Sequence, residues 1–172
     1  MKPWIKGIVV AAVHICLVAS LGAKLLYDRS VRPRVWTLAA PYDPNLPIRG
    51  RYVRLQLVVE LRGIEDKKTV NSMLPVILKV EGDHLIAQAD PDRRGYESSD
   101  LHVQFISRGD SRLAVLGKPA AFFIPENVTD PSRRPSDEEL WVEVTVPKKG
   151  PPRPIRLGVK KGDSEIVPLE LN

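Results

Sequence analysis

The sequence predicts an all-β domain, a small antiparallel sandwich or barrel, preceded by one N-terminal transmembrane helix. Short segments rich in β-branched residues follow one another after residue 33, separated by glycine, proline and aspartate, which is typical of strands joined by turns. The 16 prolines and 11 glycines are scattered along the 172 residues, as expected for many short elements. An uncharged run at residues 7–23 predicts the helix.

The uncharged run is long enough to anchor the chain in a lipid bilayer. If the amine of Lys24 reaches the headgroups, the apolar stretch is about 20 residues long, which matches a hydrocarbon core about 30 Å thick. Trp4 and Tyr27 flank the stretch, and such amphipathic rings favour the headgroup level. We therefore expect residues 4–27 to contact the bilayer.

Two properties of this segment stay open. Ser20, Gly22 and Ala23 are small residues of the kind found at signal-peptide processing sites, but no A-x-A sequence is present, so we favour an uncleaved anchor over a cleaved signal. Basic residues after the run outnumber Lys2 and Lys6 before it, which favours an outside N-terminus by the positive-inside rule. A short basic leader is instead typical of export signals, which place the following domain outside the cytoplasm.

The chain divides into an anchor at residues 1–27, a juxtamembrane linker at 28–33 and a β-rich domain at 34–172. Three lysines belong to the anchor, so the net charge of +5 falls to +2 for the remainder, which has no stripe of basic and aromatic residues. Nucleic acid is therefore not expected as a partner. The single cysteine, Cys16, lies in the anchor, which excludes disulfides and cysteine-based metal sites from the domain.

The strands of the domain are predicted from β-branched runs bounded by turn residues. Apolar and polar residues alternate in 52–58 and 140–146, which indicates one buried and one solvated face. Gly82-Asp83 and Gly109-Asp110 predict tight turns and hence antiparallel hairpins, and residues 65–72 allow a helical turn. The expected strands are 34–39, 51–61, 74–80, 84–89, 101–106, 112–116, 120–124, 140–146, 154–160 and 165–171.

One motif suggests an enzyme. The sequence Asn-Ser-Met-Leu-Pro at residues 71–75, downstream of an anchor, resembles the Ser-Met-x-Pro nucleophile motif of type I signal peptidases. This resemblance implies an alternative function, a membrane-anchored serine hydrolase that uses Ser72 together with a buried lysine. Lys79 is close to the serine in sequence and falls in the same predicted strand region. Lys118 lacks the Arg and Gly-Asp neighbours of the family's lysine.

A candidate metal-binding set combines the two histidines of the domain with nearby carboxylates. Their spacing matches no H-x-H or H-E-x-x-H ligand pair, so we interpret them as polar turn residues and expect neither a metal nor another cofactor. The set comprises His84, His102, Asp83, Asp90, Asp92 and Asp100.

A family resemblance covers residues 40–55, which read Ala-Pro-Tyr-Asp-Pro-Asn-Leu-Pro-Ile-Arg-Gly-Arg-Tyr-Val-Arg-Leu. This segment resembles the signature of the bacterial GDYXXLXY-motif membrane-anchored proteins, with Arg51 in place of the aspartate and Leu57 in place of the last tyrosine. Residues 116–126 resemble a second segment of that family. The resemblance implies a membrane-anchored, exported domain of unknown biochemical activity, without catalytic residues to carry over.

The segment 41–55 is also the most polar candidate for a binding site. Asp43, Arg49, Arg51 and Tyr52 form a set of charged and aromatic side chains suited to contact a partner. We therefore expect a protein-interaction or envelope-associated module in the bacterial cytoplasmic membrane. Its domain is expected on the periplasmic or outer side, with another membrane or envelope protein as the partner.

Overall fold

The computed structural model describes most of the chain and divides it into two compact units. Met1–Arg32 forms the first unit and Pro33–Asn172 the second. The structure describes residues 3–42, 52–63, 74–89, 101–108, 111–126, 128–148 and 150–171.

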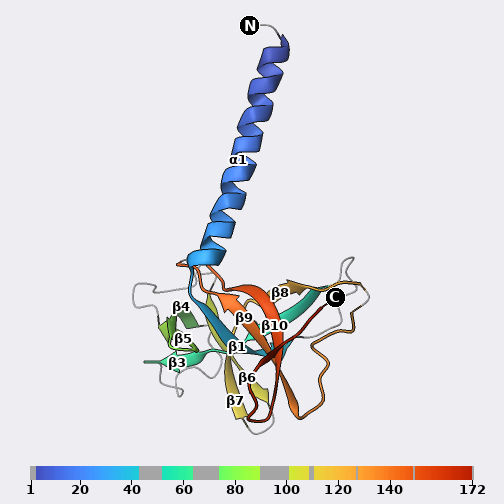
Figure 1. Cartoon of the computed structure of the whole chain (residues 1–172). Helices are drawn as coiled ribbons and strands as arrows, with labels where there is room; N and C mark the ends of the chain where they lie inside the picture. The colour runs from blue at the N-terminus through green and yellow to red at the C-terminus, as the bar shows by residue number, and fades with distance from the viewer. Residues whose placement is uncertain are drawn as a thin grey trace. The chain divides into compact units, whose positions relative to one another are not determined.

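The first unit is the helix α1, Pro3–Val31 (Figure 1). Its 29 residues extend over about 44 Å at 1.5 Å per residue, and by length and composition the helix can cross a membrane. None of its described side chains is buried. His14 Nδ1 lies 2.8 Å from the carbonyl oxygen of Val10, and Ser20 Oγ donates to that of Leu17. A polar side chain that is hydrogen-bonded to its own helix needs less free energy to enter hydrocarbon than an unpaired one.

The helix continues through residues 28–31, where the sequence predicts a linker. The carboxylate of Asp28 accepts from the guanidinium of Arg32 at 3.2 Å, and the Arg32 N–H donates to the Asp28 carbonyl at 3.0 Å. Such a pair one turn apart stabilises a helix. Pro33 then ends it, because the proline ring disfavours the helical conformation of the preceding residue. The linker is therefore shorter than predicted.

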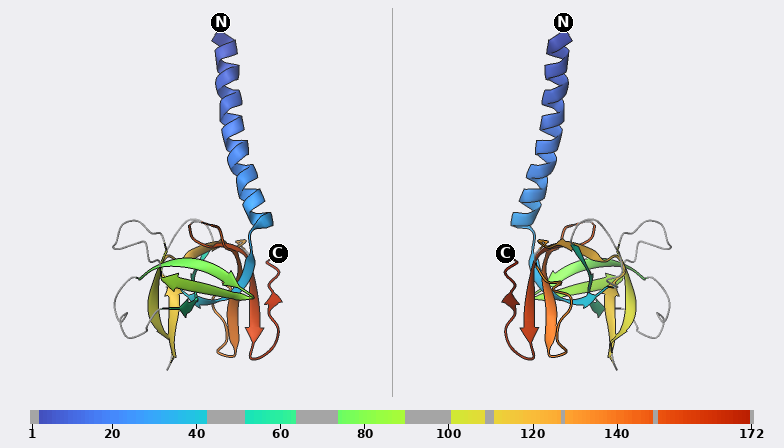
Figure 2. Two further views of the ribbon diagram at one scale, coloured as in Figure 1. Left: turned by 90° about the vertical axis from the view of Figure 1, so that its left-hand side faces the viewer. Right: turned by 90° about the vertical axis from the view of Figure 1, so that its right-hand side faces the viewer.

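The second unit is all-β, as predicted, and consists of two curled sheets that form an incomplete barrel (Figure 2). The six-stranded sheet has the order β11-β10-β9-β1-β2-β8, with all pairs antiparallel. The five-stranded sheet has the order β3-β5-β4-β6-β7, where β3 and β5 are parallel. The strands are β1 Arg34–Pro41, β2 Tyr52–Leu57, β3 Glu60–Arg62, β4 Leu74–Glu81, β5 His84–Ala89, β6 His102–Arg108, β7 Ser111–Leu116, β8 Ala120–Phe123, β9 Glu138–Thr145, β10 Arg153–Lys161 and β11 Val167–Pro168.

The predicted strand 51–61 is divided between the two sheets. The N–H of Val58 still donates to Leu38 in β1 at 2.9 Å, but the N–H of Val59 donates to Ala114 in β7, also at 2.9 Å. The chain therefore leaves one sheet and enters the other at these two residues. Residues 57–59, Leu-Val-Val, include no turn residue, so the sequence carries no sign of this switch.

The predicted hairpins are confirmed. Glu81 lies opposite His84, so Gly82 and Asp83 form a two-residue turn, in which Gly82 has a φ of 58° that a residue without a side chain adopts easily. β6 and β7 pair up to Arg108 and Ser111, with the turn residues between them outside the described part. The predicted helical turn at 65–72 also lies outside it.

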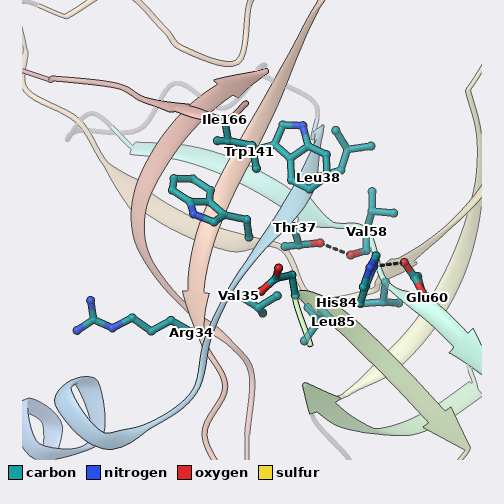
Figure 3. Close-up of a pocket in the computed structure, with 13 residues that line it drawn as sticks. Arg34, Val35, Thr37, Leu38, Val58, Glu60, His84, Leu85, Trp141 and Ile166 are labelled. Carbon is teal, nitrogen blue, oxygen red and sulfur yellow. Dashed lines mark hydrogen bonds and ion pairs between the residues drawn. The ribbon is translucent and has the colours of Figure 1, made fainter. Parts of the chain in front are cut away.

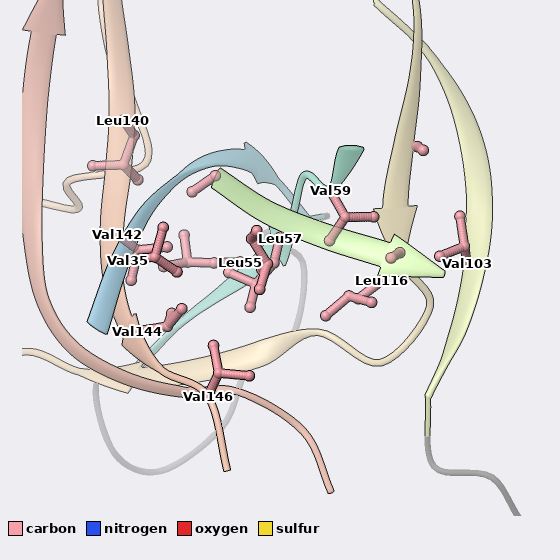
Figure 4. Close-up of a cluster of buried hydrophobic side chains, with 14 of the residues drawn as sticks. Val35, Leu55, Leu57, Val59, Val103, Leu116, Leu140, Val142, Val144 and Val146 are labelled. Atoms are coloured by element: carbon pink, nitrogen blue, oxygen red, sulfur yellow. The ribbon is translucent and has the colours of Figure 1, made fainter. Parts of the chain in front are cut away.

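The core lies between the two sheets (Figure 4). Val142 and Val144 of β9, Leu157 of β10 and Leu55 of β2 are fully buried. In β9 Glu143, the residue between the two valines, points to the opposite face, as the alternation in the sequence predicts. Leu116 and Val103 of the second sheet pack in the same cluster, so one continuous core joins both sheets.

Side chains on the other face of the six-stranded sheet hold Trp36 of β1 in place. Arg156 Nε donates to Glu143 Oε2 at 2.7 Å, and its guanidinium carbon lies 5.3 Å from the centroid of the Trp36 ring. A Cβ atom on Gly158 would lie 2.9 Å from that ring and 2.7 Å from Ile166. The close approach of indole and backbone therefore requires glycine at this point.

A surface ion pair links the end of β10 to the segment before β9. Lys161 Nζ lies 2.7 Å from Asp137 Oδ2. The hydrogen bond from Lys161 lowers the pKa of Asp137, and the same bond raises the pKa of Lys161. Both side chains are well exposed, so salt screens the pair and its contribution to stability is small.

Candidate functional site

The structure describes one of the four residues predicted to bind a partner. Asp43, Arg49 and Arg51 lie outside the described residues. Tyr52 is the first residue of β2 and lies opposite Phe123 of the edge strand β8. The two ring centroids are 6.0 Å apart with the planes tilted by 57°, an arrangement in which aromatic rings attract each other.

Phe123 makes the surface around Tyr52 unusually apolar, because this residue is 76% exposed. The guanidinium carbon of Arg54 lies 5.7 Å from the centroid of the Tyr52 ring, within the range of a cation–π contact. We name these three residues, Tyr52, Arg54 and Phe123, the aromatic patch. It combines aromatic surface with a positive charge at the edge of a sheet.

The sequence contains a signal for Phe123 that belongs to none of the motifs above. Phe122 and Phe123 are neighbours in a strand, and neighbouring side chains in a strand point to opposite faces. Phe122 packs against the core, so Phe123 must point outward. Two adjacent large aromatic residues in a predicted strand therefore indicate one exposed ring whenever the strand has a single buried face.

The residues considered for a serine hydrolase do not form the required site in the described part of the chain. Ser72 lies outside the described residues. Lys79 on β4 and Lys118 after β7 are both exposed. A lysine serves as a general base when burial disfavours its charged form, and neither of these lysines has that burial.

The histidines considered for a metal site lie far apart. His84 lies opposite Glu81 at one end of β4, whereas His102 lies opposite Pro75 near the other end. Six residues of strand separate the two positions, which corresponds to about 20 Å. Within the described ranges, no three His, Cys, Asp or Glu side chains are grouped as metal ligands. Asp90, Asp92 and Asp100 lie outside these ranges.

A cavity of about 480 Å³ opens beside β1 (Figure 3). Consecutive residues 34–38 of β1 form one wall, and Val58, Val59 and Glu60 form the wall facing it. The first residues of β5 and its turn, 83–85, close one end. Trp141 and Ile166 contribute apolar surface at the other. A cavity of this size accommodates a small molecule or part of a peptide.

The cavity has an apolar end and a polar end. In Figure 3 the side chains of Leu38, Trp141 and Ile166 lie together, away from His84 and Glu60. His84 Nδ1 is 2.5 Å from Glu60 Oε1, and the hydroxyl of the buried Thr37 donates to the carbonyl of Val58. The first contact joins the start of β5 to the start of β3, and the second joins β1 to the residue that follows β2. Both contacts lie in the wall of the cavity.

Comparisons of the chain with protein-family models, with curated proteins and with solved structures gave no significant match. The fold itself gives the class of the protein. It is an all-β domain that follows one apolar helix long enough to span a membrane.

Proposed function

We propose that this chain is a single-pass membrane protein whose β-domain binds another protein of the bacterial envelope through the aromatic patch. The helix supports the membrane part of the proposal, since its apolar side chains are exposed along its length. The resemblance of residues 40–55 to the GDYXXLXY signature supports the bacterial envelope and the exported domain.

The observation that carries the binding function is the exposure of Phe123. A large aromatic ring that is 76% exposed and lies beside Tyr52 has the character of a binding hot spot, because burying such rings contributes much of the energy of protein interfaces. A single exposed apolar residue needs no explanation, but here it adjoins a second ring and a guanidinium.

The charge of the surrounding sequence defines the partner surface. Arg54 belongs to the patch, and Arg49 and Arg51 immediately precede Tyr52 in the chain. A complementary partner presents an apolar depression for Phe123 with carboxylates around it. The proposed partner is therefore a membrane or envelope protein with an acidic, partly apolar surface.

A photoreactive group tests this surface in cells. We expect p-benzoyl-phenylalanine at Phe123 to form one specific crosslinked adduct. The yield of this adduct should fall at least tenfold when Arg54→Glu is added, because the charge reversal repels the acidic partner. The matched control places the group at Ile77, which is 42% exposed on β4 of the other sheet. Equal adducts from both positions, or an adduct that Arg54→Glu does not change, would contradict the proposal.

The side of the membrane is tested with the single native cysteine removed. In a Cys16→Ser background, Asp163→Cys places a thiol in the exposed turn after β10. We expect a membrane-impermeant maleimide to label it in intact spheroplasts, because the domain is proposed to lie outside the cytoplasm. The control Lys2→Cys should be labelled only after permeabilisation. The reverse pattern would place the domain in the cytoplasm.

A further inference from the structure

The cavity beside β1 lies along the edge of that strand. All five consecutive residues 34–38 line it. Side chains in a strand alternate between the two faces of the sheet, so a cavity on one face would contact only every second residue. A cavity that contacts all five must lie alongside the strand, where a neighbouring strand would normally pair.

The hydrogen-bond register shows which backbone groups face the cavity. β1 pairs with β9 through its other edge, and the N–H of Val146 donates to the carbonyl of Pro33 at 3.1 Å. Because residues of an antiparallel pair alternate in direction, Val35 and Thr37 face β9, whereas Trp36 and Leu38 face the cavity. Leu38 confirms this direction, since its carbonyl accepts from Val58.

Trp36 therefore has backbone groups directed at an open edge. β1 and β2 pair only from Ala39 and Leu57 onward, and the chain turns towards β7 at Val59. Within the described part of the chain, the N–H and C=O of Trp36 have no partner. Unpaired main-chain groups along a strand edge are a template for pairing with another chain.

A second strand edge lies across the cavity. β3 is the outermost strand of the five-stranded sheet and pairs with β5 on its other side. Its first residue, Glu60, lines the cavity opposite β1. β3 and β1 at Trp36 therefore present strand edges to the same opening, which ends where the carbonyl of Leu38 accepts from Val58. The β1 wall of the opening, residues 34–38, extends over about 13 Å, the length of four or five residues of extended chain.

We infer that this opening binds an extended peptide segment of another protein, which adds as a strand beside β1. The unpaired groups of Trp36 favour a peptide over a purely apolar ligand, because a peptide backbone supplies both an acceptor for the N–H and a donor for the C=O. Alternate side chains of the bound segment point in opposite directions, so an apolar one enters the end formed by Leu38, Trp141 and Ile166.

The charge of the opening specifies the segment further. The carboxylates of Glu60 and Asp83 lie at the polar end together with His84. Arg34 also lines the opening, but in Figure 3 its guanidinium extends away from His84 and Glu60. A segment that places lysine or arginine at the polar end is therefore complementary. The inference extends the proposed protein-binding function by naming an extended, basic and apolar strand as a second partner element. Along the strands, the opening is about 25 Å from Tyr52, so the two sites can be tested separately.

The free edge itself is tested first, with the full-length chain in nanodiscs. We expect the amide of Trp36 to exchange with deuterium at least a hundredfold faster than those of Val35 and Thr37, which face β9. Equal protection of all three amides would show that the edge is already occupied and would overturn the inference.

The occupant is tested with octapeptides that alternate randomised apolar residues with threonine and end in lysine or in glutamate. We expect the lysine-ended set to bind at least tenfold more tightly and to slow exchange of the Trp36 amide at least tenfold. N-methylation of alternate amides in the tightest peptide should weaken it at least tenfold, because it removes the strand hydrogen bonds. Equal binding of methylated and unmethylated peptides, or protection of Trp36 by lipid alone, would overturn the inference.

Two variants separate this site from the aromatic patch. Trp141→Ala is expected to weaken the tightest peptide at least fivefold, whereas Phe123→Ala should leave its affinity unchanged. The exchange measurement on the unaltered chain remains decisive if Trp141→Ala folds poorly. Loss of peptide binding in Phe123→Ala alone would contradict the proposed site, and the crosslinking result at Phe123 stands independently of both.

Discussion

Arginine at both Val13 and Leu17 is expected to abolish stable insertion of the chain into membranes. Both residues lie near the middle of α1 and are exposed, so in a bilayer their side chains face hydrocarbon. Each arginine at the centre of a spanning helix costs about 2.5–3.5 kcal/mol, and two cost about 5–7 kcal/mol. This is enough to shift the chain at least a thousandfold towards the uninserted state.

Carbonate extraction of membranes measures this effect, with the unaltered chain expected in the membrane fraction and the double variant in the supernatant. The matched control places the two arginines at Trp4 and Tyr27, near the ends of the apolar stretch, where long basic side chains reach the headgroups. This control should stay membrane-bound. A double variant that resists extraction as well as the control would mean that α1 does not span.

Leu55→Ala is expected to have the largest effect on the stability of the domain. Leu55 is completely buried between the two sheets, so the smaller side chain leaves a cavity in a core that both sheets share. Substitutions of this kind lower the free energy of unfolding by about 2–5 kcal/mol. Urea denaturation of the full-length chain in nanodiscs, followed by the fluorescence of Trp36 and Trp141, measures the change.

Ile77→Ala is the matched control, because it removes an aliphatic side chain of the same size from a position that is 42% exposed. Its effect should stay below about 1 kcal/mol, the range of strand propensity. If Leu55→Ala and Ile77→Ala lowered stability equally, the two sheets would not share the core described above.

The sequence predicts the helix and the positions of most strands because both depend on local patterns. An uncharged run is sufficient for α1, and turn residues such as Gly82 and Asp83 indicate where the hairpins bend. The last predicted strand is much longer than β11, which has two residues, one of them Pro168. Proline has no N–H to donate, so this edge cannot extend the sheet regularly.

The sequence by itself therefore determined the class of the protein, an all-β domain behind one apolar helix, because periodicity and hydrophobic length are properties of neighbouring residues. Tertiary structure alone decided that Val58 and Val59 pass from one sheet to the other, that Phe123 lies beside Tyr52 and that β1 keeps an open edge at Trp36. Each of these features depends on hydrogen bonds or contacts between segments distant in the chain. Which distant segments pair is decided by side-chain packing and strand register, and a local sequence pattern contains neither.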